Sequence, residues 1–378
     1  MAIYHKAILP AGFTASATCA GIRNNGKVDL ALYYSEIPAK ASCVFTANKI
    51  IAAPLVVSKK HLLASSSHQA IIANSGNANC FTGKRGLEDA EAEAGSAAKY
   101  LGLSQREVLV ASTGVIGKPL PIKKIMNAVP VLVKGLSRKG IDKAKLAIMT
   151  TDTFAKEVTA QFKIGKKKVT ICGIAKGAGM IAPNMATMLS FIFTDANIEK
   201  GILKKALVEA VNNSFNCITV DGCMSTNDTV IVMANGAADN LLINGGSSYQ
   251  AFLKALNTVC IDLAQSIVKD GEGATKFIII KVIGARNKSE AKTACLAIAN
   301  SNLFKTAVFG ENPNFGRIVA AVGASGIAVR EDSIKIKVSS LKKKEINVLV
   351  SLGVGKSDAV VFTSDLTPEY VKINAEYN

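Results

Sequence analysis

The chain has 378 residues, of which 49% are hydrophobic and 19% are charged, and its formal net charge is +17. This length predicts one large domain or about two domains of ordinary size, and the composition excludes an intrinsically disordered chain. Lysine clusters such as Lys166–Lys168 and Lys342–Lys344 are short and lack interleaved aromatics, so we expect a solvated surface that attracts anionic small substrates and no nucleic-acid partner.

The N-terminus is not expected to be a secretory signal. Lys6 is followed by small apolar residues, but Pro10 and Thr14 interrupt them before an apolar core of a signal peptide forms. Further along the chain we expect no apolar run of the ~20 residues that span a bilayer. The sequence therefore predicts a soluble, cytoplasmic protein with no membrane partner.

Strands and helices alternate through the first half of the chain. Residues 69–73 predict an apolar strand that ends in the loop "NSGNANCFTG". The stretch "GLEDAEAEAGSAAKYLGLS" places acidic residues early and Lys99 late, which complements the dipole of a helix. "VLVAST", from Val108, predicts a strand that runs into a second glycine loop, "STGVIG".

The second half is richer in strands. Alternation predicts strands at 167–174, 188–196 and 229–236, and helical spacing of apolar residues predicts helices at 198–215 and 249–268. Three more strands are expected within 276–285, 334–339 and 345–355. Because strands often follow one another directly, an α+β or layered α/β fold fits better than a regular alternating barrel.

Cysteines and histidines give little support for metal or imidazole chemistry. The eight cysteines contain no CxxC pair and favour small core residues over a disulfide framework. The three histidines all lie before residue 69, so a Ser-His-Asp triad is poorly supported and no zinc spacing occurs. We expect no metal and no cofactor.

The segment "KGAGMIAPNMATML", residues 176–189, offers a nucleophile that needs no histidine. Gly177, Gly179 and Pro183 predict an adaptable turn before Thr187, whose hydroxyl can attack the Ala186 carbonyl and move the acyl group from nitrogen to oxygen. Water then frees a terminal threonine, whose α-amine serves as general base. A threonine entering a strand is also simply a β-branched residue, and the residues alone leave both interpretations open.

The same segment resembles the self-processing signature of the ornithine acetyltransferase family, also called glutamate N-acetyltransferase. Other motifs agree in order over essentially the whole chain: "LPAGFTASATCAGI", "NSGNAN", "ASTGVIG", "AIMTTDT", "DGCMSTNDTV", "KDGEGATKF", "NPNFGRI" and "YVKINAEY". The resemblance implies a layered α/β/β/α sandwich, as in the self-processing aminopeptidases. It also implies cleavage between Ala186 and Thr187 into an α chain (1–186) and a β chain (187–378) that form one folded unit, and a pair of such αβ units (α2β2).

The resemblance further implies an activity and a set of site residues. Thr187 accepts acetyl from N2-acetylornithine and passes it to glutamate in ping-pong order, and acetyl-CoA is a possible second donor. Thr113 and Gly114 match the oxyanion hole, which stabilises charge on the carbonyl oxygen. The implied substrate contacts are Thr150, Lys176, Thr187, Glu272 and Asn374. Asn378 ends the chain where the family commonly has a substrate-binding Ser or Thr, and its side chain or carboxylate can substitute.

Blander interpretations stand beside these assignments. Taken alone, "STG" is a plain turn, and Lys176 and Glu272 are ordinary charged loop residues. Two other functions remain alternatives: a related aminopeptidase or amidase with water as acceptor, and a basic nucleic-acid-binding protein. Acetyl transfer to glutamate, compared with hydrolysis, separates the first alternative, and a steep salt dependence of nucleic-acid binding would identify the second.

Overall fold

The computed structural model describes residues 1–23, 25–182 and 188–376 and divides into two compact units. The described residues of unit 1 lie within Met1–Gly177, 188–214 and Ser225–Leu263. Those of unit 2 lie within 178–182, Phe215–Met224 and 264–376. Unit 1 therefore contains residues from both sides of the predicted cleavage position.

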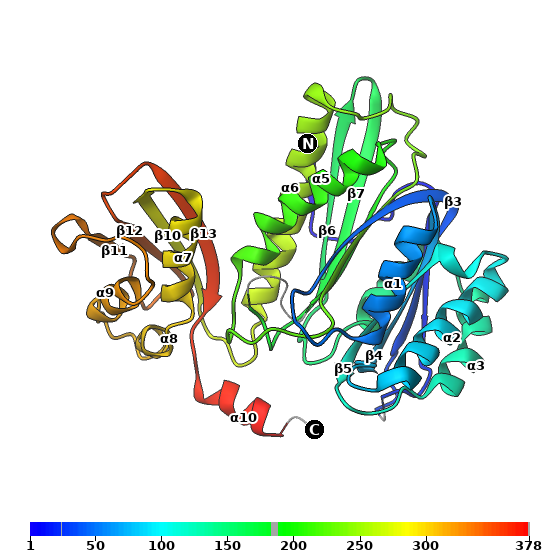
Figure 1. Ribbon diagram of the computed structural model, residues 1–378, viewed down its shortest axis with the longest axis horizontal. Coiled ribbons are helices and arrows are strands. Elements are labelled where there is room, and N and C mark those ends of the chain that lie inside the picture. The colour runs from blue at the N-terminus through cyan, green and yellow to red at the C-terminus, as the bar shows by residue number, and fades with distance from the viewer. Residues whose placement is uncertain (24, 183–187, 377–378) are drawn as a thin grey trace. The chain divides into compact units, whose positions relative to one another are not determined.

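Unit 1 is built on a sheet of nine strands in the described part of the chain, in the order β1-β6-β7-β8-β9-β3-β4-β5, with β2 paired to β3 (Figure 1). The strands are β1 Ala2–Tyr4, β2 Phe13–Thr18, β3 Leu30–Phe45, β4 His68–Asn77, β5 Val108–Val115, β6 Lys156–Ile164, β7 Lys167–Lys176, β8 Leu189–Thr194 and β9 Thr229–Ala234. The first half of β3 pairs with β2 and β4, and its second half pairs with β9 after a break between Tyr34 and Ala39. This long strand thus belongs to both layers of the sheet.

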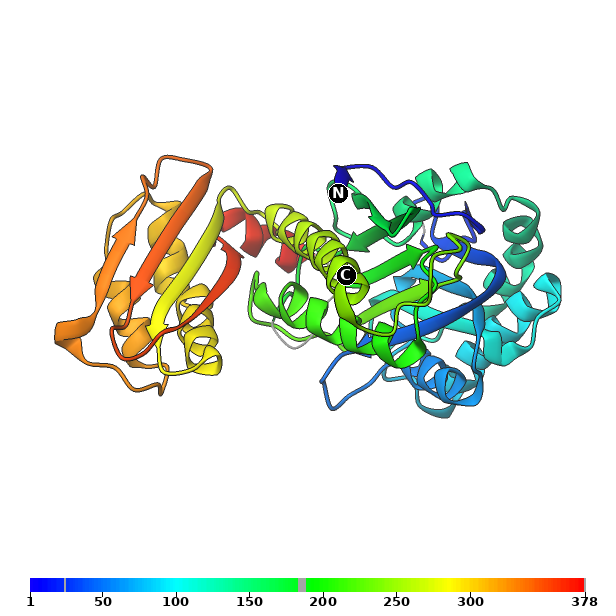
Figure 2. The ribbon, with the colours of Figure 1, turned by 90° about the horizontal axis from the view of Figure 1, so that it is seen from above.

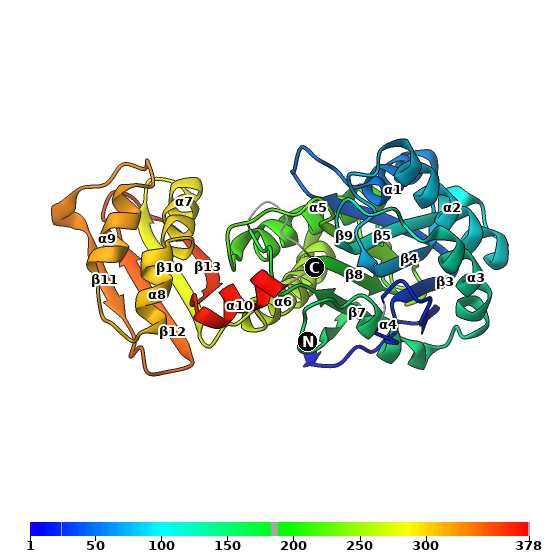
Figure 3. The same ribbon diagram turned by 90° about the horizontal axis from the view of Figure 1, so that it is seen from below.

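The apolar residues of unit 1 fill two spaces. One cluster joins the two sheet layers and includes Tyr33, Leu109, Ile174 and Phe191. A second lies between β4 and β5 and the helices α1 Ala53–Ala64, α2 Gly83–Leu101 and α3 Ile122–Lys134 (Figure 3). The alanines of α2 recur at helical spacing and face this cluster, as expected for an amphipathic helix.

The other layer of unit 1 is covered by α6 Gly246–Lys269, with α5 Lys200–Asn212 beside it (Figure 1). A Cβ on Gly173 of β7 would lie 2.7 Å from Val259 and 2.8 Å from Leu263, so glycine permits this close approach of helix and strand. The short helix α4 Ile141–Ala147 packs into the core between the sheet layers. The predicted α/β/β/α sandwich is confirmed for unit 1.

Helix α6 is long and apolar enough to cross a membrane by length and composition alone, which differs from our sequence expectation. However, 56% of its most apolar window is buried inside the protein. Phe252 lies 6.5 Å from the ring of Phe162 in β6, and Val259 and Leu263 pack on Gly173. This burial is typical of a core helix in a water-soluble fold.

Unit 2 is a smaller sheet in the order β11-β12-β10-β13, with helices packed on it (Figure 2). Its strands are β10 Phe277–Ala285, β11 Lys335–Val338, β12 Glu345–Ser351 and β13 Ser357–Ser364, and its helices are α7 Lys288–Ala299, α8 Asn302–Phe309, α9 Gly316–Gly323 and α10 Pro368–Glu376. Alternate residues such as Ile278 and Ile280 are buried, whereas Lys281 is exposed. This period of two puts one face of the sheet against α7 and its neighbours.

Candidate active site

The segment predicted to process itself begins at the end of β7 and resumes at Met188, just before β8. The structure describes it as far as Ala182. Residues 183–187 lie outside the described residues, as does Asn378. The cleavage position between Ala186 and Thr187, the nucleophile Thr187 and the terminal contact at Asn378 therefore stay predictions.

Lys176, the last residue of β7, brings three of the predicted residues together. Its side chain is buried, with 2% of the residue exposed. The Nζ atom donates to Thr150 Oγ1 at 2.7 Å and to Thr113 Oγ1 at 3.5 Å. A buried cation and two hydroxyl groups thus occupy one place in unit 1, although they come from three separate parts of the chain.

Asp152 fixes the backbone on both sides of this contact. Its Oδ1 accepts from the Gly177 amide at 2.7 Å and from Lys156 Nζ at 2.6 Å, and its Oδ2 accepts from the Thr150 amide at 2.9 Å. The side chains of Asp152 and Lys156 are both fully buried. Burial alone would raise the pKa of Asp152, but Lys176, Lys156 and the Gly177 amide outweigh it and lower this pKa to about 2.

We call Thr113, Thr150, Asp152, Lys156 and Lys176 the Lys176 cluster. Sequence reasoning missed Asp152 and Lys156. The only signal in the sequence was that Asp152, inside the "TTDT" motif, lies four residues before Lys156.

Gly114 occupies a position where a side chain would not fit. Its φ is +136°, and a Cβ there would lie 2.3 Å from the carbonyl carbon of Gly76 and 2.5 Å from the amide nitrogen of Asn77. Glycine therefore lets the end of β5 pair closely with β4, which holds Thr113 opposite Ser75. This geometry gives Thr113 and Gly114 a fixed backbone, while their role as oxyanion donors stays a prediction.

The loop before β9 is hydrogen-bonded to Met188, which lies just before β8. The Met188 amide donates to Asp228 Oδ1 at 3.0 Å, and the Thr229 amide donates to the Met188 carbonyl at 3.1 Å. Asn227 Nδ2 donates to the carbonyls of Ala78 at 2.6 Å and Ser112 at 2.9 Å. Met188, just before β8, and Ser112, just before Thr113, are thus both bonded to the "STND" loop. Sequence reasoning also missed Asp228 in this loop.

The remaining predicted residues, Glu272 and Asn374, lie in unit 2. Asn374 Nδ2 donates to Glu272 Oε2 at 2.8 Å, and the Glu272 amide donates to the Ala178 carbonyl at 3.1 Å. A Cβ on Gly179 would lie 2.2 Å from Glu272 Oε2, so this glycine leaves space for the carboxylate. Glu272 is half-buried and Asn374 is exposed.

Asp221 holds the described part of the processing segment within unit 2. Its carboxylate accepts from the amides of Met180 at 2.6 Å and Ile181 at 2.9 Å, and from the Tyr370 hydroxyl at 3.2 Å. Met180 has a φ of +56°, a left-handed conformation that is unusual for a residue with a side chain. We call Asp221, Glu272, Tyr370 and Asn374 the Asp221 cluster.

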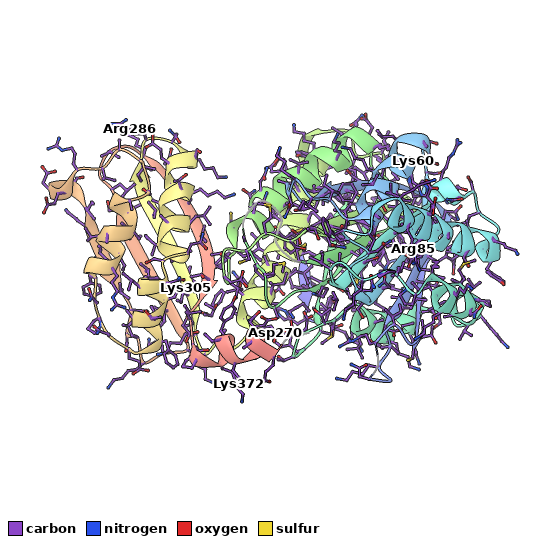
Figure 4. All side chains as sticks on the ribbon, turned by 60° about the horizontal axis from the view of Figure 1, so that its bottom comes forward. Lys60, Arg85, Asp270, Arg286, Lys305 and Lys372 are labelled. Atoms are coloured by element: carbon purple, nitrogen blue, oxygen red, sulfur yellow. The ribbon has the colours of Figure 1, made fainter. Side chains whose placement is uncertain are left out.

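Lys305, on α8, is a buried cation of unit 2 that the sequence did not suggest; Figure 4 labels it together with Lys372 on α10. The residue is 2% exposed, and its Nζ donates to the Val220 carbonyl at 2.7 Å and to Thr363 Oγ1 at 3.1 Å. Burial lowers the pKa of Lys305 to about 8, against the attraction of Asp221 and Asp365.

The histidines lie apart from these clusters in the contacts that the structure gives. His61 is buried and bonds the Val108 carbonyl at 2.7 Å, and burial lowers the pKa of His68 to about 4. His5 pairs with Asp262 at 3.3 Å. Among the described residues no group of three His, Cys, Asp or Glu side chains could hold a metal ion.

Comparison with known proteins now identifies the class of protein. The ArgJ family model matches residues 14–343 and 337–378. The "Arginine biosynthesis bifunctional protein ArgJ" of Caldanaerobacter subterraneus is 47% identical over 397 residues, covering 98% of this chain and 98% of the relative. The protein of the same name from Geobacter sulfurreducens is 47% identical over 388 residues, covering 97% of this chain and 98% of the relative.

Among solved structures, the ornithine acetyltransferase of Mycobacterium tuberculosis complexed with ornithine is 37% identical, covers 48% of this chain and 97% of that chain, and has a TM-score of 0.45. The extent of the family match settles membership: the chain belongs to the ArgJ family. It is an acyltransferase of arginine biosynthesis, as the ordered motifs predicted.

Proposed function

We propose that this protein transfers an acetyl group from N2-acetylornithine to glutamate through an acetyl ester on Thr187. The observation that supports it most directly is the buried Lys176 ammonium beside the hydroxyls of Thr113 and Thr150, at the entry of the predicted processing segment. The relatives' shared name and the ornithine-bound relative agree with such substrates.

The proposed reaction starts with self-cleavage between Ala186 and Thr187, which frees the Thr187 amine. That amine takes the proton of the Thr187 hydroxyl, since an α-amine has a pKa of about 7.7–8.0. The oxygen attacks the acetyl carbonyl of N2-acetylornithine, and ornithine leaves with the proton. The amine of glutamate then attacks the ester, so the reaction is ping-pong.

Each site residue has a proposed role. The Thr113 hydroxyl and the Gly114 amide donate to the oxyanion that forms in both half-reactions. Lys176 pairs with the α-carboxylate of the substrate, and Thr150 orients both Lys176 and the substrate. Glu272 pairs with a substrate ammonium group, and Asn374 orients Glu272. Asn378 is proposed as a further contact through its side chain or its carboxylate.

Three further features belong to this proposal. Acetyl-CoA is a second candidate donor, because the relatives are named bifunctional. Chains 1–186 and 187–378 are proposed to stay associated as α2β2, and the protein to work in the cytoplasm. Incubation with acetyl-CoA and glutamate tests the donor, and sedimentation analysis of the mature protein tests the assembly.

The decisive experiment changes Thr187 to alanine. Thr187→Ala is expected to remain one band of 39.5 kDa on a denaturing gel and to lose acetyl transfer. Thr258→Ala, which removes a hydroxyl bonded to Lys254 of the same helix, is the matched control and should behave as wild type. Mass spectrometry of wild type with N2-acetylornithine but no glutamate should find acetyl on Thr187. A Thr187→Ala chain that still splits after Ala186 would refute the assignment.

A further inference from the structure

Self-cleavage and acetyl transfer place different demands on the proton acceptor. In mature protein the free amine of Thr187 can accept the proton of its own hydroxyl. In the precursor the same nitrogen is part of the peptide bond to Ala186, and an amide nitrogen is not a useful base. If the proposed function holds, the first cleavage therefore needs another group to accept this proton.

Asp228 contacts the described residue that directly follows Thr187 in the chain. Its Oδ1 accepts from the amide of Met188, the residue bonded directly to Thr187, at 3.0 Å. Leu189 of β8 pairs with Thr229 of β9 in parallel register, and the Thr229 amide donates to the Met188 carbonyl at 3.1 Å. Two hydrogen bonds therefore hold Asp228 near the start of β8. One joins the Met188 amide to the Asp228 side chain, and the other joins the amide of the next residue, Thr229, to the Met188 carbonyl.

The carboxyl group is buried and incompletely bonded. Asp228 is 0% exposed, and its Oδ2 has no hydrogen-bond partner among the residues that the structure describes. The surrounding loop is otherwise well bonded, since Thr46 Oγ1 donates to the Ser225 carbonyl at 2.8 Å and the Thr46 amide donates to the Asp228 carbonyl at 3.0 Å. A buried polar oxygen without a partner is uncommon and points to a role.

The surroundings of Asp228 favour proton capture. Burial raises the pKa of Asp228 well above its ordinary value, while the Met188 amide, the side chains of Thr46 and Ser225 and the charge of Lys176 act in the opposite direction. Lys176 of β7 is the charged group that acts on it; Thr46, which follows β3, and Met188, which precedes β8, are uncharged. A carboxylate with a raised pKa holds a captured proton more firmly than an ordinary one.

Other candidates for proton acceptor in unit 1 fit less well. Both oxygens of Asp152 already accept hydrogen bonds, and its pKa is lowered to about 2. His61 bonds the Val108 carbonyl, and His68 bonds the His61 carbonyl at 3.3 Å. Of these groups, Asp228 combines a hydrogen bond from the Met188 amide with a carboxyl oxygen that has no partner in the described part of the chain.

We propose that the Asp228 carboxylate is the proton acceptor for self-cleavage between Ala186 and Thr187. The Thr187 O–H bond breaks, its proton passes to Asp228, and the oxygen bonds to the Ala186 carbonyl carbon. The bond from that carbon to the Thr187 nitrogen then breaks, and Asp228 returns the proton to this nitrogen. The result is an ester isomer of the chain, which water hydrolyses to an Ala186 carboxylate and a free Thr187 hydroxyl.

The test follows splitting of the full chain after a short cell-free synthesis pulse. Asp228→Asn keeps the size of the side chain and the acceptor for the Met188 amide but cannot take up a proton. It is expected to split at least ~100-fold more slowly than wild type, in line with the contribution of a general base. A merely structural role would be preserved by asparagine. Splitting within about threefold of wild type would overturn the proposal.

Asp195→Asn is the matched control. Asp195 follows the other end of β8, is 6% exposed, accepts from the Thr170 amide at 2.8 Å and also has a pKa raised by burial. This variant should split at the rate of wild type. An equal loss in both variants would mean that any buried carboxyl in this sheet is needed for folding, and would overturn the specific role of Asp228.

A second readout keeps the proposal testable if Asp228→Asn does not fold. The wild-type splitting rate should rise about tenfold per pH unit while Asp228 ionises and then level off, because only the carboxylate accepts the proton. A rate that is flat between about pH 5 and 8 would overturn the proposal. Thr187→Ala distinguishes failure of this proposal from failure of the proposed function. If the Thr187→Ala chain stays intact while Asp228→Asn splits at the normal rate, the proposed function survives and Asp228 is not the proton acceptor.

Discussion

The Lys176 cluster of unit 1 and the Asp221 cluster of unit 2 both collect polar residues from distant parts of the chain, but they differ in exposure. Lys176 and Lys156 are 2% and 1% exposed. In the Asp221 cluster, Glu272 is half-buried and Asn374 is exposed. Buried charges need opposite charges nearby, whereas charges in contact with water do not.

We therefore expect the two clusters to respond differently to mutation. Removing a charge from the Lys176 cluster should lower the stability of the fold together with any effect on catalysis. Removing the charge of Glu272 from the Asp221 cluster should change substrate binding and leave stability nearly unchanged.

Asp152→Asn should produce the largest loss of stability. It removes the carboxylate that contacts Lys156 Nζ at 2.6 Å between two fully buried side chains. Breaking a buried pair costs about 3–5 kcal/mol, because the remaining charge stays in the interior. Calorimetry should show a lower melting temperature for Asp152→Asn, and the double variant Asp152→Asn with Lys156→Met should recover part of the loss. A melting temperature equal to that of wild type would contradict the contrast.

Thr113→Val should reduce turnover strongly and leave folding intact. Valine keeps the β-branched shape in β5 but removes the hydroxyl proposed to donate to the oxyanion. Loss of one such donor lowers kcat by about 100- to 1,000-fold. Steady-state kinetics of acetyl transfer would measure it, with Thr170→Val in β7 as a buried threonine control. Normal turnover in Thr113→Val would remove Thr113 from the proposed oxyanion hole.

Lys305 tests whether unit 2 also contains a charge whose burial is costly. Its folded pKa of about 8 lies below the ordinary lysine value of 10.5, so the unfolded chain binds more protons between these two values. Stability should therefore rise with pH across this window, by about 3 kcal/mol when the pKa difference is converted to free energy. Unfolding midpoints of wild type and Lys305→Met, compared from pH 7 to 11, check this. The same rise in both proteins would exclude Lys305 as its source.

Regular elements and the family-bearing motifs were predictable from the sequence, because both depend on local patterns. The strands β4, β5 and β7 follow from apolar runs and alternation, the helix α2 from its charge distribution and the helix α6 from helical spacing, and the match of the chain to the ArgJ family confirms the resemblance. The sharing of β3 between two sheet layers was not predictable, because β9, which pairs with its second half, lies far along the chain. Asp152, Asp228 and Lys305 look like ordinary polar residues in the sequence, and only tertiary contacts reveal their burial.

Glu272→Gln should give the smallest of the four effects and sharpen the contrast. Glutamine keeps the length of the side chain and can still accept from Asn374 Nδ2, which lies 2.8 Å from Glu272 Oε2, but it cannot pair with a substrate ammonium group. We expect the KM for N2-acetylornithine to rise about tenfold, equivalent to about 1.4 kcal/mol, with kcat nearly unchanged. The melting temperature should match wild type, since a half-buried carboxyl bonded to an exposed amide contributes little to folding.

Glu369→Gln, at an exposed position on α10, is the matched control and should leave both the KM and the melting temperature unchanged. A stability loss in Glu272→Gln as large as that of Asp152→Asn would show that exposure does not separate the two clusters.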